Sequence, residues 1–149
     1  MKDLANNISI IQSIAPVVGT SDTNGTGVDL QFFESATAVV DTGVEGDTLS
    51  TSVKIDFKLE DSDDNSSFSA VTSSLHVTDG SVDSNGIFLT LDANAETPQV
   101  TSIGYVGGKR YLRVVADFTG THSNGTPIAA TIIKGSPRHN TDADTLSTA

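Results

Sequence analysis

The acidic segment LEDSDDNSSF, residues 59–68, has side chains that could bind a metal ion. Three of them have the spacing of the first three ligands of an EF-hand calcium loop: Asp61, Asp63 and Asn65. The later positions do not match, because Ser66 stands where that loop needs glycine and Thr72 where it needs a bidentate glutamate. The segment therefore predicts a hairpin turn, with a weak cation site as the alternative, and we expect no metal site.

The three histidines form no recognisable ligand or catalytic pattern. No HxH, HExxH or Glu-x-x-His spacing joins His76, His122 and His139. The chain also has no G-x-S-x-G elbow, phosphate-binding loop or G-x-G-x-x-G fingerprint. A Ser/His/Asp triad assembled in space is an open alternative, because Ser and Asp are abundant. The patterns as a whole predict a protein that is not an enzyme and has no cofactor.

The segment GYVGGKRYLRVVAD, residues 104–117, holds three of the eight basic residues of the chain. Alternation along a strand at 110–118 predicts that Lys109, Tyr111 and Arg113 share the outer face, with Arg110 on the inner side at the strand entrance. Two interpretations are open. The cations balance acidic residues on neighbouring strands, or they form with Tyr111 a contact patch for another chain, since Tyr and Arg are enriched at interfaces. The second interpretation makes Lys109, Tyr111 and Arg113 partner contacts.

Composition limits the classes of partner. The chain has 149 residues, a formal net charge of −11 and a pI near 4.3. We therefore expect no nucleic-acid partner and no anionic membrane partner, since both need clustered Lys and Arg. There is no cysteine, so disulfides and thiolate metal sites cannot contribute. Polar residues interrupt the apolar start of the chain, and we expect neither a signal peptide nor a membrane span.

The elements that must position these residues read as β-strands. SVKIDFKLE, residues 52–60, alternates strictly, with its apolar side chains on one face: Val53, Ile55, Phe57 and Leu59. Further short strands are predicted at 28–33, 37–42, 68–71, 74–77, 86–91, 99–106, 110–118 and 127–134. Three Asn-Gly pairs mark turns between them. This pattern predicts an all-β fold: a single-domain antiparallel β-sandwich or jelly-roll-like barrel of about eight strands.

The two ends differ from the middle of the chain. Residues 1–18 are moderately apolar and predict an N-terminal arm that packs on another surface. Residues 19–138 contain the predicted strands and form the sandwich domain. Residues 139–149 are polar and predict a C-terminal tail.

Several blocks of the sequence together resemble a family of small virion proteins of tailed bacteriophages and gene-transfer particles. The blocks are MKDLANNISIIQSIAPVV, VDLQFFESATAVVDTG, FKLEDSDDNSSF, GYVGGKRYLRVV and IIKGSPRHN. The resemblance implies a head decoration, or cement, protein on the phage head exterior. Its partner would be the major capsid protein, and it would form a homo-oligomer, with a trimer favoured. The resemblance carries no catalytic residues.

Two other functions stay open at this stage. The first is a neck, tail or other virion component, which the same resemblance allows. The second is a β-sandwich carbohydrate-binding or hydrolytic module, for which Tyr105 and Tyr111 are the available aromatic platforms.

Overall fold

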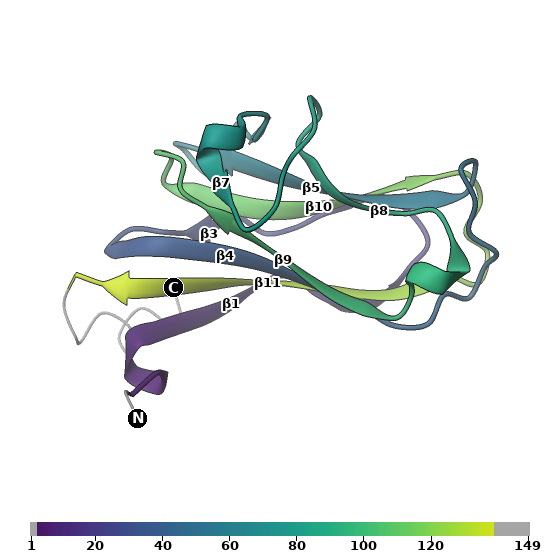
Figure 1. Ribbon diagram of the computed structural model, residues 1–149, viewed down its shortest axis with the longest axis horizontal. Helices are drawn as coiled ribbons and strands as arrows, with labels where there is room; N and C mark the ends of the chain where they lie inside the picture. The colour runs from purple at the N-terminus through teal and green to yellow at the C-terminus, as the bar shows by residue number, and fades with distance from the viewer. Residues whose placement is uncertain (1–2, 139–149) are drawn as a thin grey trace.

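The computed structural model describes residues 3–138, which form two antiparallel β-sheets packed face to face (Figure 1). The prediction of an all-β sandwich is confirmed, with eleven strands in place of about eight. The strands are β1 (Ile8–Gly19), β2 (Thr23–Asn24), β3 (Val28–Asp29), β4 (Phe33–Thr42), β5 (Lys54–Ser62), β6 (Ser69–Ala70), β7 (Val77–Thr78), β8 (Ile87–Leu91), β9 (Gln99–Tyr105), β10 (Tyr111–Thr119) and β11 (Thr126–Pro137). Three short 3₁₀ turns complete the fold: η1 (Ala5–Asn7), η2 (Ser74–His76) and η3 (Asn94–Glu96).

The first sheet has the strand order β1-β11-β4-β9-β7, and every pair is antiparallel. The second sheet is built around β10 and β5, with β2 and β3 beside β10 and with β6 and β8 beside β5. Figure 1 shows β5 and β10 in one layer and β4 and β11 in the other. No helix in residues 3–138 is both long and apolar enough to cross a membrane.

The core lies between the two sheets, where alternation places the apolar side chains. On β5 the predicted inward residues Ile55, Phe57 and Leu59 are completely buried. On the paired strand β10, Leu112, Val114 and Ala116 are completely buried as well. Each large apolar side chain removed from water contributes about 1.5–3 kcal/mol, so these two strands supply much of the stabilisation of the fold.

The N-terminal segment differs from the prediction. Residues 8–19 are not an arm outside the sandwich but the edge strand β1, which pairs with β11 from Ile8 to Gly19. A moderately apolar, extended segment fits either an N-terminal arm or an edge strand of a sheet. Residues 8–19 form an edge strand because β11 offers an unpaired edge to them. Register shifts on both sides of Ile14 bend β1 toward the second sheet, where the Ser13 hydroxyl accepts the Val114 N–H at 3.0 Å.

Several other predicted strands are shorter than expected, and in two of them part of the segment forms a turn. The strand predicted at 28–33 ends at Asp29, because a tight turn follows before β4 begins at Phe33. The strand predicted at 74–77 is mostly the 3₁₀ turn η2, and pairing with β9 begins at Val77. The predicted tail, residues 139–149, lies outside the described residues.

The acidic segment forms the predicted hairpin turn between β5 and β6. The Asp64 carboxylate accepts the backbone N–H groups of Ser66 at 2.9 Å and Ser67 at 2.7 Å, and the Ser62 hydroxyl at 2.8 Å. These hydrogen bonds favour the charged form and hold the pKa of Asp64 well below its usual range. Within residues 3–138, no three His, Asp or Glu side chains lie close enough together to hold a metal ion.

Candidate functional site

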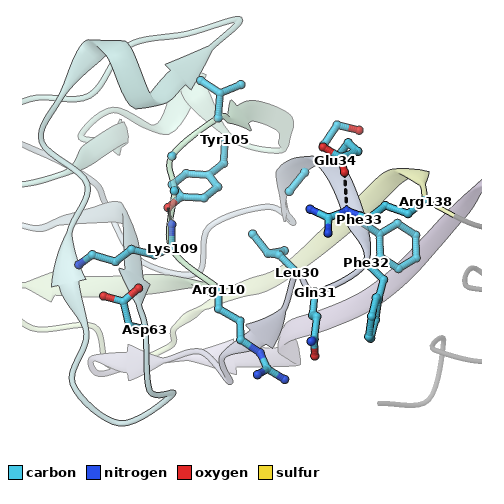
Figure 2. Close-up of a pocket in the computed structure, with 15 residues that line it drawn as sticks. Leu30, Gln31, Phe32, Phe33, Glu34, Asp63, Tyr105, Lys109, Arg110 and Arg138 are labelled. Atoms are coloured by element: carbon cyan, nitrogen blue, oxygen red, sulfur yellow. Dashed lines mark hydrogen bonds and ion pairs between the residues drawn. The ribbon is translucent and has the colours of Figure 1, made fainter.

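A groove of about 500 Å³ lies at one end of the sandwich, between the β3–β4 turn and the β9–β10 loop (Figure 2). We call it the end groove. The β3–β4 turn supplies Leu30, Gln31 and Phe32, and the β9–β10 loop supplies the residues from Val106 to Arg110. The segment after β11 adds Arg138. Loops carried on rigid sheets are the usual position of binding residues, which makes the end groove the candidate site.

The β3–β4 turn holds Phe32 in a conformation that bulky residues rarely adopt. Its φ angle is +71°, in the left-handed region. Three hydrogen bonds fix the turn: Phe33 N–H to the Leu30 carbonyl at 3.2 Å, Gln31 N–H to the Asp29 carboxylate at 2.9 Å, and Arg138 N–H to the Phe32 carbonyl at 3.0 Å. Phe32 is nevertheless 40% exposed. In Figure 2 it lies across the groove from Tyr105 and Lys109.

The β9–β10 loop is anchored by a buried polar cluster. The Tyr105 hydroxyl donates to the Asp61 carboxylate at 2.8 Å, and the Lys109 ammonium pairs with the same carboxylate at 2.9 Å. The Lys109 N–H donates to the Tyr105 hydroxyl at 3.3 Å. Burial, together with the bond to Asp61, raises the pKa of Tyr105 above its usual value of 10.0. Gly107 is needed beside this cluster, because a Cβ there would lie 2.4 Å from the Tyr105 ring.

Half of the eight basic residues of the chain gather at this end of the molecule. Arg110 makes a bidentate contact with Asp29, with N–O distances of 3.0 and 2.7 Å, and Arg138 pairs with Glu34 at 2.5 Å. The bond from Arg110 lowers the pKa of Asp29. With Lys109 bound to Asp61, three of these cations each meet a carboxylate, and Asp63 adds one further carboxylate to the lining, so the end groove carries little net charge for a strongly acidic protein.

The fourth cation, Lys134, lies behind the groove and is buried. Its side chain is on the inner face of β11, and the residue is only 2% exposed. The ammonium donates to the backbone carbonyl of Asp29 at 3.1 Å and lies 4.7 Å from the centre of the Phe33 ring. Burial lowers the pKa of Lys134, because a charged ammonium loses its hydration there. Lys134 thus ties β11 to both ends of the β3–β4 turn.

The structure separates the three residues that were predicted to form one outward patch. Tyr111 and Arg113 share the outer face of the second sheet, as alternation predicted. Lys109 does not join them, because it precedes β10 and turns to Asp61, whose side chain is buried on the inner side. Side-chain alternation applies only within a strand, and Lys109 lies in the loop before β10. The buried carboxylate of Asp61 therefore determines where the Lys109 ammonium lies.

The contacts of Arg113 support the interpretation that the cations of this segment balance acidic residues on neighbouring strands. It lies opposite Glu60 across the β10–β5 pair, and its guanidinium binds that carboxylate at 2.6 and 2.8 Å. The guanidinium also lies 4.1 Å from the centre of the Phe68 ring. Arg110, predicted on the inner side, is half-exposed and pairs with Asp29 instead. The cations of this segment therefore balance acidic neighbours, which leaves less free charge for a partner than the second interpretation assumes.

Sequence reasoning did not identify the features that shape the end groove. Phe32 was placed in a strand, and no residue type near it predicts a positive φ angle. Lys134 lies where alternation predicts an apolar inward side chain, so its position was predictable but its partners were not. Arg138 comes from a segment more than one hundred residues away from Glu34 in sequence.

The aromatic platforms proposed for a carbohydrate module are only partly available. Tyr105 is 3% exposed and its hydroxyl is bound to Asp61, so it cannot stack on a sugar ring. Tyr111 is half-buried, with the Arg110 guanidinium 5.1 Å from its ring centre. The fold and the site together define an antiparallel β-sandwich with a groove between loops at one end. No family profile matches the chain, and no curated protein shows significant similarity to it.

Proposed function

We propose that this chain is a structural protein of a phage virion, a decoration protein that binds the outside of the major capsid protein shell. The resemblance of residues 1 to about 140 to small virion proteins supports this function. The proposed contact is the end groove, with the exposed ring of Phe32 as its anchor. The proposal includes no catalytic step and no cofactor.

The geometry of Phe32 is the observation that carries this choice of contact. A bulky residue at positive φ costs about 1 kcal/mol or more, and it persists only where surrounding bonds hold it. Three hydrogen bonds of the turn do so here, yet the residue they position is 40% exposed and is not part of the buried core. Aromatic side chains presented in this way are the usual energetic centres of protein interfaces.

The charge balance of the groove fits a protein partner. Because three cations lie at the groove, a partner meets less of the repulsion there than the net charge of −11 produces elsewhere. A decoration protein also needs only modest affinity at each contact, since several copies or several contacts act together on a shell. A single aromatic anchor with a polar rim suits that requirement.

The test is co-sedimentation with heads of the virus that encodes the chain, purified from a mutant that lacks it. Wild-type protein should bind, and Phe32→Gly should bind at least tenfold more weakly, because the anchor is gone. Glycine accepts the positive φ angle without strain, so the melting temperature should not fall. Val44→Ala is the matched control, because it removes another exposed apolar side chain from the opposite end of the sandwich. Absence of wild-type binding would overturn the function, and equal binding by Phe32→Gly would overturn the contact.

The neck or tail alternative predicts a different copy number. Quantitative mass spectrometry of purified particles should find hundreds of copies for a decoration protein, and only six or twelve for a neck ring. The same measurement tests the virion location itself, because a protein absent from particles has neither role.

A further inference from the structure

The two sheets differ sharply in the chemistry of their outer faces. The outer face of the second sheet carries six charged side chains: Lys54, Asp56, Lys58, Glu60, Arg113 and Asp117. On the outer face of the first sheet, the paired residues of β1, β11, β4 and β9 include one charged side chain, Asp41. Solvent-facing sheets normally carry charge, which also discourages association. The first sheet lacks that protection.

Most of the residues on the outer face of the first sheet are small or β-branched, and the others there include the uncharged Gln12. The central row of this face runs across four strands and consists of Gln12, Thr131, Val39 and Ser102. In the row beside it, Ile10 on the edge strand and Ile133 on β11 are adjacent, and Ile10 is 57% exposed. Short side chains on paired strands leave a flat surface, which suits packing against another sheet.

We propose that this face, which we call the uncharged face, binds the same face of a second copy of the chain. Two copies of a protein with a charge of −11 repel each other over much of their surface, so a contact between them needs a surface with little negative charge. The uncharged face meets that condition against a like copy, because Asp41 is the one charged side chain among its paired residues. A basic partner would instead be matched by an acidic surface, which this face does not offer.

The area of the face is sufficient for such a contact. Four strands about 4.8 Å apart, with about 3.4 Å per residue, make a face of roughly 19 by 30 Å. Two copies would then bury about 1,200 Å² in total, at the lower end of the range for specific interfaces. We therefore expect a reversible dimer that dissociates on dilution. A self-complementary contact of this kind joins copies in pairs, which differs from the trimer that the family resemblance favours.

Asp41 provides a way to distinguish a second copy of the chain from a basic protein bound to this face. In a dimer each copy brings an Asp41 carboxylate onto the same shared face, where the two repel. Asp41→Asn should therefore tighten the dimer several-fold, and added salt should tighten the wild-type dimer by screening the same charges. A basic protein bound to this face would show the opposite response to both changes.

The experiment is sedimentation equilibrium of the purified chain alone, over a range of concentrations that reaches the millimolar. Wild-type protein should change from monomer to dimer, and Thr131→Glu should raise the dissociation constant about a hundredfold by placing a negative charge at the centre of the face. Thr119→Glu makes the same change on the exposed outer face of the second sheet and should leave dimerisation intact. Because no capsid is present, the result is independent of the proposed function.

Folding of the variants is checked by circular dichroism and thermal melts. If Thr131→Glu does not fold, Val100→Glu replaces it, since Val100 is 67% exposed on the same face. A chain that stays monomeric at every concentration would overturn the proposal. So would an oligomer that Thr131→Glu, or Val100→Glu in its place, leaves intact.

Discussion

The hydrogen bond from Tyr105 to Asp61 gives a prediction with a definite magnitude. The Tyr105 hydroxyl is buried and donates to a carboxylate at 2.8 Å. A hydrogen bond to a charged group contributes about 1.5–3 kcal/mol, so Tyr105→Phe should lower the free energy of unfolding at pH 7 by about 2 kcal/mol. For a domain of this size that corresponds to a fall of about 4–8 °C in melting temperature.

The same residue predicts a dependence on alkaline pH. The folded state raises the pKa of Tyr105 above the 10.0 expected in the unfolded chain, chiefly through burial. Above pH 10 the unfolded state loses this proton while the folded state keeps it, so stability falls as the pH rises. At pH 11 the wild type has lost about 1.4 kcal/mol of this contribution. The difference between wild type and Tyr105→Phe should therefore shrink to about 0.6 kcal/mol.

Urea unfolding of both proteins at pH 7 and pH 11 measures these differences. Tyr111→Phe is the matched control, because the Tyr111 side chain lies on the outer face of β10 and not in the buried cluster around Asp61. It should change the free energy of unfolding by less than about 0.5 kcal/mol at either pH. If Tyr105→Phe is as stable as wild type at pH 7, or if the difference is the same at pH 11, the hydroxyl does not anchor the β9–β10 loop as described.

Three further changes test other parts of the structure. Ile55→Asp should prevent soluble folding, because it buries an unpaired charge at a completely buried site; recovery of soluble protein with a native melt would contradict the assigned strand facing. Asp64→Ala should lower the melting temperature by loosening the β5–β6 turn, and neither calcium nor EDTA should change the melting temperature of either protein. Because the pKa of Asp64 is depressed in the folded state, wild type should lose stability as it is acidified below pH 4, and Asp64→Ala should lose less. A calcium-dependent rise in the melting temperature of wild type would indicate a cation site. Burial lowers the pKa of Lys134, so just below pH 10.5 the unfolded state binds more protons than the folded state, and the stability of wild type should rise as the pH increases. Lys134→Met should lack this rise, and parallel curves of stability against pH for the two proteins would refute the prediction.

The alternation of apolar and polar residues was enough to predict the fold class and the facing of the central strands. Ile55 and Leu59 on β5, and Leu112 on β10, lie inward as predicted, because the two-residue period of a strand fixes which side chains share a face. The turn at Asn65 was also predictable, since its neighbours Asp64 and Ser66 have side chains and N–H groups that make local hydrogen bonds. These features depend on residues that are close together in sequence.

Features that depend on distant residues were decided by the tertiary structure. β1 is an edge strand because β11 offers it an unpaired edge, although the two are more than one hundred residues apart. Lys109 turns inward because Asp61, on another strand, places a buried carboxylate within 2.9 Å of its ammonium. Phe32 has a positive φ angle in a turn closed by two local hydrogen bonds, and the distant backbone N–H of Arg138 holds its carbonyl from outside the turn. A local pattern contains no information about which distant backbone or carboxylate will be adjacent, and at the end groove those neighbours determine the geometry.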